Sequence, residues 1–246
     1  DTIDTRKGHA IKRRATLEGD EWVINGEEQW PSNSGVASLY LTVCTTDPDL
    51  GEEGIALIYV PAPTKGLDFG DFEVKAGMAA DRNCTIYYDN VRVPERYRVA
   101  GPGDDANLLR EMVVAGNIGS AGRSIGPAQN TFEIVTKYAS ERVVAGKPIK
   151  EHSISAVMLA DMAIGIETAR TYTVNVAHMF DHPEIYGPRW SSEMVAKSRI
   201  AKIYAADVAV NVTNEAMKLM GSNGYSRPYD VEKHWRDTKI AQIYLG

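Results

Sequence analysis

The sequence is poor in the features that mark membrane, nucleic-acid-binding and disulfide-rich proteins. No apolar stretch approaches the roughly 20 residues needed to span a membrane, and the first residues do not resemble a signal peptide. The chain has no basic run and its net charge is −6, which argues against a nucleic-acid binder. Its two cysteines, Cys44 and Cys84, have neither metal-site nor disulfide spacing. These absences predict a globular protein without a metal, in a reducing, cytoplasmic setting.

The first 100 residues have the pattern of a β domain. Short runs rich in β-branched and aromatic residues follow one another without helices between them. Gly19-Asp20 marks one turn, and Asn25-Gly26 has the sequence of a hairpin turn. Strands at this spacing predict a β-sandwich or small barrel. The expected strands cover residues 15–17, 22–26, 38–45, 54–60 and 83–88.

After Gly101 the apolar residues recur at helical spacing. The first expected helix begins at Ala106 and crosses a glycine-rich stretch, residues 115–122. Each glycine costs about 1 kcal/mol relative to alanine, so we expect either a close approach to that backbone or a local break. Long antiparallel helices with short links predict a four-helix bundle, and strands followed by helices define an α+β fold. The further helices are expected at 125–141, 153–180, 192–220 and 231–239.

The closing stretch, residues 221–246, combines a glycine turn, a short helix and a second turn. Gly and Asn in Gly221-Ser222-Asn223-Gly224 tolerate left-handed backbone. With Arg236-Asp237 and the final Ile243-Tyr244-Leu245-Gly246, this stretch resembles the closing signature of the acyl-CoA dehydrogenase family. Leu159-Ala160-Asp161-Met162 also resembles a helix of that family, which we interpret as a core marker. Arg236-Asp237 is interpreted as support for the closing turn.

The resemblance covers essentially the whole chain and implies a domain organisation. Residues 1–100 correspond to the middle β domain, with its start truncated, and residues 101–246 to the C-terminal helical bundle, with its end truncated. The family's N-terminal helical domain is expected to be missing from this sequence. A homotetramer built as a dimer of dimers, with FAD shared across a subunit interface, is implied in the same way.

Trp30 and Ser32 form a first candidate cofactor site. A flat aromatic ring beside a hydrogen-bond donor suits a planar heterocycle such as a flavin. A tryptophan that caps a sheet and a serine that closes a turn would account for the pair equally well. The resemblance implies that Trp30 stacks near the flavin and that Ser32 bonds its redox-active edge, with Pro31 as a mild departure.

A second group of residues corresponds to the family's contacts with the rest of FAD. Glu141-Arg142 precedes a glycine and a proline, which is a helix stop signal, and arginine can bind a pyrophosphate with two hydrogen bonds. The resemblance implies that Arg142 contacts the FAD pyrophosphate. Gly221 also matches the family. Lys218 and Ser153 each stand where the family has a glutamine, and Ser222 stands where it has a glycine. Ala145 replaces the family's usual aromatic residue.

The family's catalytic glutamate is missing. Removal of the substrate α-proton requires a base, and the resemblance places that base at Leu245 or, in other branches, at Gly116. The arginine that usually follows the second position is Asn117. Gly116, Asn117, Tyr244 and Leu245 are therefore expected to line a roomy substrate pocket that suits a bulky or cyclic acyl group, with the base unknown.

Three functional hypotheses follow from this departure. The first is FAD-dependent α,β-dehydrogenation of an acyl-CoA, with electron-transfer flavoprotein as the oxidant and a base from elsewhere, such as Glu111 or the missing domain. The second is a non-redox acyl-CoA lyase or hydratase on the same fold. The third is a catalytically inactive assembly paralogue. Among the histidines, His234 is the one that could carry a proton at neutral pH.

Overall fold

The computed structural model describes residues 11–244 and divides the chain into two compact units. Unit 1 contains the residues up to Lys75 together with Ala79–Glu111. Unit 2 contains Ala76–Met78 and the chain from Met112 onward. Unit 1 carries the six-stranded sheet and unit 2 carries most of the helical residues, so the fold is α+β, as expected.

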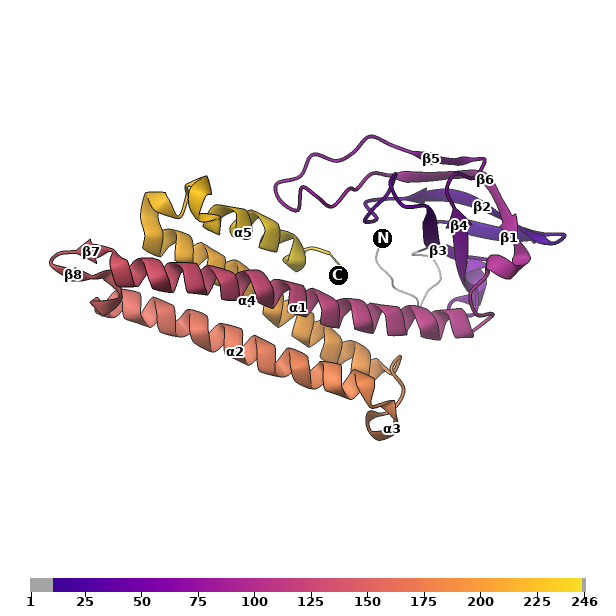
Figure 1. Cartoon of the computed structure of the whole chain (residues 1–246). Helices are drawn as coiled ribbons and strands as arrows, with labels where there is room; N and C mark the ends of the chain where they lie inside the picture. The colour runs from indigo at the N-terminus through magenta and orange to yellow at the C-terminus, as the bar shows by residue number, and fades with distance from the viewer. Residues whose placement is uncertain (1–10, 245–246) are drawn as a thin grey trace. The chain divides into compact units, whose positions relative to one another are not determined.

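Unit 1 is built on a curled six-stranded sheet (Figure 1). The strands follow the spatial order β4-β3-β1-β2-β6-β5, and every pairing is antiparallel except the single parallel contact of β1 with β3. The aliphatic side chains of one sheet face form the core, with Ile24, Ile58 and Ile86 fully buried. The strands are β1 (Arg14–Glu18), β2 (Glu21–Glu28), β3 (Leu39–Thr45), β4 (Ile55–Pro61), β5 (Leu67–Phe69) and β6 (Ile86–Pro94).

The predicted hairpin turn at Asn25-Gly26 is wrong. Both residues lie inside β2, where the register with β6 shifts between Ile24 and Gly26. Gly26 has φ +131°, and a Cβ there would lie 3.0 Å from the Cα of Arg13. The glycine is therefore needed for a β-bulge and a close backbone approach, which are the other common uses of glycine in a strand. The turn between β1 and β2 is at Gly19-Asp20, as predicted.

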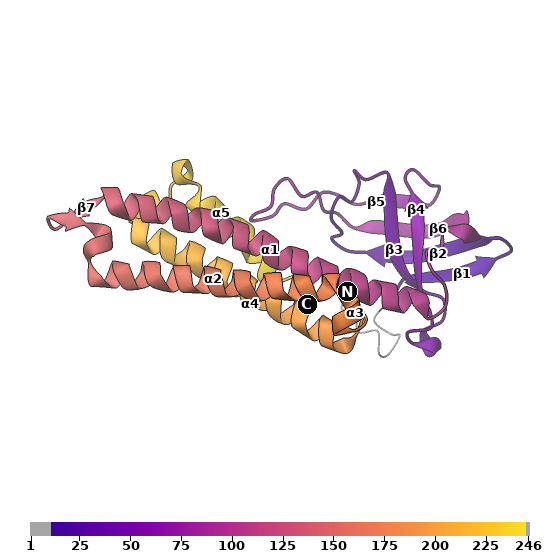
Figure 2. The ribbon, with the colours of Figure 1, turned by 60° about the horizontal axis from the view of Figure 1, so that its bottom comes forward.

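Unit 2 is a bundle of long helices (Figures 1 and 2). Two-residue strands β7 (Val143–Val144) and β8 (Lys147–Pro148) form the hairpin that joins the first two helices. The buried side chains of the bundle are mostly alanine, valine and methionine, so the helices share one apolar core. The helices are α1 (Asp104–Glu141), α2 (Ser153–Asp181), α3 (Pro183–Tyr186), α4 (Ser192–Met220) and α5 (Val231–Thr238).

One continuous helix, α1, replaces the two helices that we expected before residue 141. It has 38 residues and crosses Pro127 without ending. The helix is unbroken across residues 115–122, and a Cβ added at Gly119 or Gly122 would have no atom within 4 Å. Both expectations for this stretch are therefore wrong at these two positions, and Gly126, further along the helix, also has open space beside it. The glycines leave open space beside the helix.

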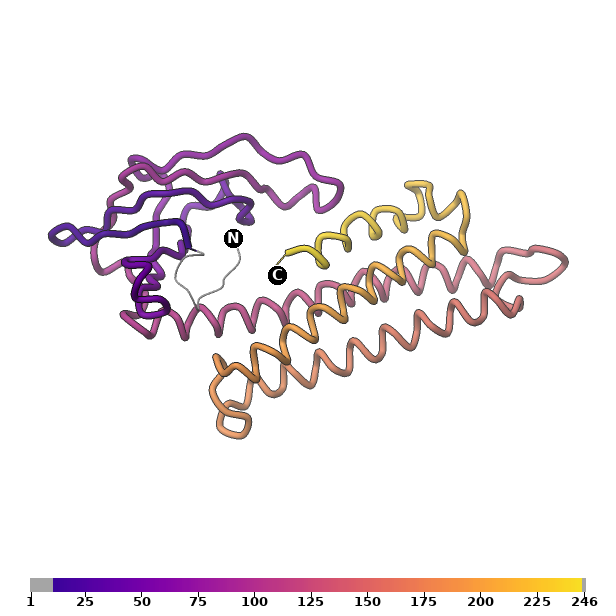
Figure 3. The backbone as a smooth tube through the Cα atoms, turned by 180° about the vertical axis from the view of Figure 1, so that it is seen from behind, coloured from indigo at the N-terminus to yellow at the C-terminus, as the bar shows by residue number. Residues whose placement is uncertain are grey.

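The closing stretch folds back along α4 (Figure 3). After α4 the chain passes through the short 3-10 helices η5 (Gly221–Asn223) and η6 (Arg227–Tyr229) into α5, and then into η7 (Lys239–Gln242). Val231, at the start of α5, is fully buried in the bundle core. Within residues 11–244, none of the helices is sufficiently long and apolar to cross a membrane.

Arg236 and Asp237 hold a different segment from the one we predicted. The Arg236 guanidinium donates to the carbonyl of Ala76 at 2.9 Å, and the Asp237 carboxylate accepts from the N–H of Met78. A Cβ on Gly77 would lie 2.4 Å from the Arg236 carbonyl oxygen, so only glycine fits between them. The pair attaches residues 76–78 to α5, and within residues 11–244 its side-chain hydrogen bonds do not reach the closing turn.

Candidate functional site

Arg142 lies directly after α1, at the hairpin end of the bundle. Its carbonyl accepts a hydrogen bond from the N–H of Ile149 at 2.9 Å, which fixes the backbone across the β7–β8 hairpin. The residue is exposed, and in the described part of the chain no hydrogen bond or ion pair occupies its guanidinium. This side chain is available to an anionic ligand such as a phosphate.

The turn after α4 is tied to the same end of the bundle. The side-chain amide of Asn223 donates to the Tyr138 hydroxyl at 3.0 Å, one turn before Arg142 on α1. Gly221 is exposed and has φ +59°, which favours glycine. Ser222 is also exposed. Backbone and hydroxyl groups of this turn are thus accessible next to the end of α1.

Lys218 and Ser153 are placed less favourably for a phosphate contact. The Lys218 ammonium lies 2.5 Å from the Glu215 carboxylate, so a negative charge already accompanies it. Ser153 is the first residue of α2 and is exposed. The preceding His152 does not cap the helix with its side chain, because its Nε2 lies 3.0 Å from the Val144 carbonyl.

Trp30 and Ser32 lie in unit 1, on the loop between β2 and β3. Trp30 has φ +64° and its side chain is 48% exposed, so the indole is open on one side. The amide of Asn83 donates to the Trp30 carbonyl at 3.2 Å and fixes this backbone. The Ser32 hydroxyl donates to Asp81 Oδ2 at 3.2 Å, which leaves its oxygen as an acceptor.

The expected substrate-pocket residues lie along the contact between α1 and α4. Asn117 is fully buried, and its amide nitrogen donates to the Ser198 hydroxyl at 3.1 Å. The Tyr244 hydroxyl donates to Ser120 Oγ at 2.5 Å, one turn after Gly116 on α1. The structure therefore brings Asn117, Tyr244 and the neighbourhood of Gly116 to one helix–helix contact, whereas Leu245 lies outside the described residues.

Two cations that sequence reasoning missed accompany Tyr244. The Arg123 guanidinium donates to the tyrosine hydroxyl and lies 5.2 Å from the ring centroid. The Lys202 ammonium lies 5.4 Å from the same centroid. The sequence could have indicated the burial of Lys202, because this residue lies one turn after Ser198 and one turn before Ala206, both on the buried face of α4. A lysine at a core position of a helix is unusual.

The remaining candidate proton carriers are already engaged. Glu111 belongs to unit 1, and its side chain is not without an interaction partner. His234 Nδ1 lies 2.9 Å from the hydroxyl of Thr131, and its Nε2 lies 3.3 Å from the amide of Asn130. Burial lowers the pKa of His234, and the positive charge of Lys233 lowers it further. His234 is thus a neutral link between α5 and α1 at neutral pH.

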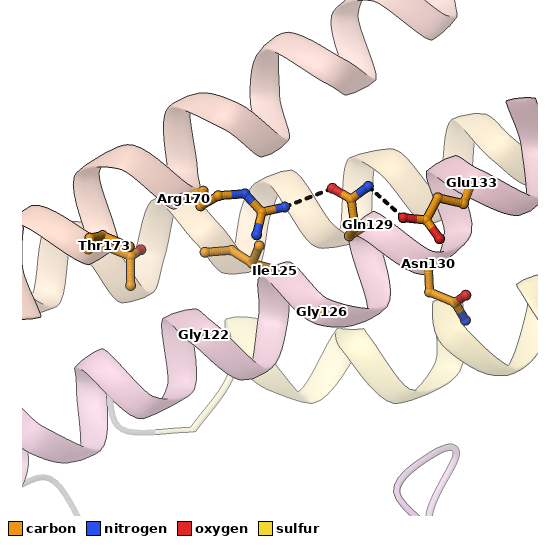
Figure 4. A pocket seen from close by; sticks show the side chains of 9 residues that line it. Gly122, Ile125, Gly126, Gln129, Asn130, Glu133, Arg170 and Thr173 are labelled. Carbon is orange, nitrogen blue, oxygen red and sulfur yellow. Dashed lines mark hydrogen bonds between the residues drawn. The ribbon is translucent and has the colours of Figure 1, made fainter.

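A separate cavity of about 370 Å³ lies between α1 and α2 (Figure 4). Arg170 donates to the Gln129 side-chain carbonyl at 2.7 Å, and the Gln129 amide donates to Glu133 at 2.9 Å. Gly122 and Gly126 line it, so it is the open space left by these glycines. None of the predicted site residues lines this cavity.

Within residues 11–244, no group of three or more His, Cys, Asp or Glu side chains lies close enough together to bind a metal ion. His178 and His182 stack with ring centroids 4.4 Å apart, and His182 Nδ1 lies 3.0 Å from Glu184. Both cysteines are buried and unpaired. The site chemistry therefore depends on the polar groups of the bundle and of the Trp30 loop.

Comparison with known proteins identifies the family. The chain matches the family models of the acyl-CoA dehydrogenase C-terminal domain over residues 107–246 and of the acyl-CoA dehydrogenase middle domain over residues 7–91. This chain belongs to the acyl-CoA dehydrogenase family, which confirms the resemblance seen in the sequence.

Individual relatives agree with this assignment. Cyclohex-1-ene-1-carbonyl-CoA dehydrogenase of Geobacter metallireducens is 32% identical over 96% of this chain and 60% of its own length. Human mitochondrial short-chain specific acyl-CoA dehydrogenase is 30% identical over 96% of this chain and 56% of its own. The structure of butyryl-CoA dehydrogenase from Megasphaera elsdenii superimposes with a TM-score of 0.88 at 30% identity, over all of this chain and 63% of that one. The chain thus spans less than two thirds of these relatives.

Proposed function

We propose that the protein catalyses α,β-dehydrogenation of an acyl-CoA thioester, with FAD as the hydride acceptor. The observation that carries this proposal is that the exposed Arg142, whose guanidinium has no hydrogen bond or ion pair within residues 11–244, lies at the same end of the bundle as the exposed Gly221-Ser222 turn. Both sets of groups suit a pyrophosphate. The relatives named above act on acyl-CoA esters by their names, which supports the substrate class.

The residues of the chain fit FAD at these two places. In unit 2, Arg142 would bind the pyrophosphate, and the Gly221 turn would receive the adenosine side. In unit 1, the open face of Trp30 would receive the isoalloxazine, with Ser32 at its edge. Lys218 contributes less, because Glu215 accompanies it. When bound, FAD supplies the oxidising group that takes the β-hydrogen with its electron pair.

The acyl group is proposed to be bulky or cyclic. Gly116 and Leu245 replace the carboxylate at the two base positions, and Ala145 replaces an aromatic side chain. One of the relatives is named for a cyclohexene-carbonyl-CoA substrate. Side chains that are smaller or uncharged leave room and an apolar surface for a ring.

Assembly into a homotetramer, as a dimer of dimers, is part of the proposal. Large apolar side chains stay exposed on α2 and α4 of the bundle, among them Ile154, Ile164, Ile200 and Ile203. Exposed apolar side chains at helix surfaces favour burial against another subunit. Electron-transfer flavoprotein is proposed as the electron acceptor, as the resemblance implies, and a cytoplasmic location stays a prediction.

A non-redox lyase or hydratase remains the second candidate, because no carboxylate occupies either base position. An assembly role without catalysis is the third. Anaerobic addition of cyclohex-1-ene-1-carbonyl-CoA or butyryl-CoA to the full-length, FAD-loaded protein separates the three. Bleaching of the flavin with formation of an unsaturated acyl-CoA supports the dehydrogenase. A flavin that stays oxidised while the thioester is consumed supports the lyase, and the absence of thioester binding supports the assembly role.

A further inference from the structure

The cavity between α1 and α2 holds two opposite charges on one network of hydrogen bonds (Figure 4). Arg170 on α2 donates to the side-chain carbonyl of Gln129 on α1 at 2.7 Å, and the Gln129 amide nitrogen donates to Glu133 at 2.9 Å. All three residues line the cavity, which lies within unit 2. The glutamine amide therefore holds a guanidinium at one end of the network and a carboxylate at the other.

The protein satisfies neither charge completely. An arginine carries five N–H donors, and the Gln129 carbonyl takes one of those on Nη2 of Arg170. Glu167 lies 3.6 Å from Nε, and among the residues that the structure describes Nη1 has no hydrogen-bond partner. Within the same part of the chain, Glu133 has no cationic partner and accepts a hydrogen bond from Gln129 alone. Donors and an acceptor thus remain for a ligand.

A buried hydroxyl lies in the wall of the same cavity. Thr173, one turn after Arg170 on α2, is 6% exposed and lines the cavity. Its Oγ1 has no hydrogen-bond partner within residues 11–244. Burial of such a group is costly unless a partner is provided. Because residues three apart share one face of a helix, Arg170 and Thr173 present their donors from the same side of α2.

The remaining wall of the cavity is apolar, and its volume is small. Ile125 and Val174 line it, and a Cβ at Gly122 or Gly126 would meet no atom within 4 Å. The volume of about 370 Å³ is near the lower end of the roughly 300–1,000 Å³ of ligand pockets. The cavity therefore lacks the room for FAD or for a whole acyl-CoA, and it suits a small molecule with a short apolar part.

We propose that this cavity binds a free α-amino acid with an apolar side chain. The carboxylate of the amino acid accepts from Nη1 of Arg170 and from the Thr173 hydroxyl, its ammonium donates to Glu133, and its side chain packs on the apolar wall. The Gln129 amide already joins the same two charged groups through an acceptor oxygen and a donor nitrogen. An α-amino acid has an acceptor and a donor in the same order but with full charges, and charged hydrogen bonds are the stronger ones. The site is independent of the proposed function.

The two charges favour a zwitterion over other occupants. A simple carboxylate would leave Glu133 without a cation and add a like charge to a small cavity, which is unfavourable. A simple amine would leave Arg170 without an anion in the same way. An apolar side chain from a second copy of this chain would cover both charges without pairing either, and the burial of unpaired charges is costly.

Isothermal titration calorimetry of the full-length protein with L-leucine tests the site. L-Leucine should bind saturably, with one molecule per chain. The analogue 4-methylpentanoate lacks the ammonium and 3-methylbutylamine lacks the carboxylate, so each should bind at least about tenfold more weakly. Arg170→Met and Glu133→Gln remove the two charges from the protein, and each should weaken leucine binding at least about tenfold.

A leucine side chain placed inside the cavity gives a steric test. Gly126→Leu fills the space that the amino acid would occupy and should abolish its binding. Gly119→Leu on the same helix is the matched control, because its Cβ also meets open space but Gly119 does not line the cavity. The control should bind L-leucine as the wild type does. Thermal melting and size-exclusion chromatography verify the fold and the oligomeric state of each variant.

Several results would overturn the inference. The first is a wild-type protein that binds none of L-leucine, L-valine and L-phenylalanine; a changed oligomeric state of Gly126→Leu would then assign the cavity to a contact between copies of the chain. Equal affinities for 4-methylpentanoate and L-leucine would make it a plain carboxylate site. Wild-type affinity in folded Gly126→Leu would place the ligand elsewhere. Flavin bleaching has no part in these measurements, so the proposed function can fail without changing their outcome.

Discussion

The carboxylate of Asp237 on α5 accepts a hydrogen bond from the backbone N–H of Met78, 159 residues earlier in the chain, with 2.6 Å between the two atoms. Lys233 also bonds this carboxylate from one turn earlier in the helix. Burial alone would raise the pKa of Asp237. The hydrogen bonds of Lys233 and Met78 and the charges of Lys233 and Arg236 outweigh it, so the pKa is lowered.

Asp237→Asn should therefore destabilise the protein in a pH-dependent way. A carboxylate whose folded pKa is lowered stabilises the fold above its unfolded pKa, near 4, and loses that stabilisation as pH falls through the folded pKa. At pH 7 we expect a loss of about 1–3 kcal/mol in the free energy of unfolding. Urea titrations at pH 7 and pH 3 measure the change, which should shrink at the lower pH. Asp161→Asn, at an exposed site on α2, is the control and should have no effect at either pH; an equal loss at both pH values for Asp237→Asn would contradict the charge argument.

Gly77→Ala should destabilise the same contact by a steric route. Its Cβ would lie 2.4 Å from the Arg236 carbonyl oxygen, and overpacking of this kind costs about 1–3 kcal/mol. Gly119→Ala is the matched control, because its Cβ would meet open space on α1. Alanine is the better helix former, so this variant should gain up to about 1 kcal/mol. Chemical unfolding measures the stability of both variants. If Gly77→Ala were as stable as the wild type, the close approach of Gly77 to Arg236 would be disproved.

The ion pair of Arg98 and Asp105 should be essential to unit 1. The Asp105 side chain is fully buried, lies 2.7 Å from Arg98 Nε and also accepts from the N–H of Ala100. Asp105→Ala leaves a mostly buried guanidinium without its counter-charge, although Arg98 still donates to the Ile55 carbonyl, and this costs about 3–5 kcal/mol. A double variant, Arg98→Met with Asp105→Leu, should recover much of this loss, since it removes both charges together.

The exposed pair of Arg92 and Glu18 is the control for that experiment. Its atoms are 2.6 Å apart, but both side chains are about half exposed. Glu18→Gln should leave the free energy of unfolding nearly unchanged, because solvent screens the pair. Thermal or urea unfolding compares the two sites, and equal losses at both would refute the role given to burial.

Both cysteines should resist thiol reagents in the folded protein. Cys44 and Cys84 are fully buried, and burial raises the pKa of Cys44 to about 12. The thiolate is the reactive form, so at pH 8 an aromatic disulfide reagent should label neither residue until urea is added. Rapid labelling of one thiol in the native protein would show that its part of the sheet opens.

The long helices could be predicted because their signals are local. Expected helices at 153–180 and 192–220 correspond to α2 and α4 almost residue for residue. Apolar residues on one helical face and a glycine after Met220 specify such segments without reference to the rest of the chain. The same holds for the strands β2, β3 and β4, whose β-branched runs are long enough to be read alone.

Structural features that depend on contacts with residues far away in the sequence, such as the Gly26 bulge and strand β5, could not be predicted. Asn25-Gly26 has the sequence of a turn, but the approach of Arg13 makes it a bulge. The three residues of β5 carry too little pattern, and the strand exists because Leu67 pairs with Tyr88. Pairing energy and close contacts override local preference at such places.

The candidate site divides in the same way. The order of motifs around Arg142, Gly221 and Arg236-Asp237 is enough for the family, and the absence of a carboxylate at Gly116 and Leu245 is visible in the sequence alone. Only the tertiary structure shows that Lys202 is buried beside Tyr244, and that Asp237 holds Met78. A residue's identity is fixed by the chain, but the loss of water around it, and hence its reactivity, depends on which helices pack against it.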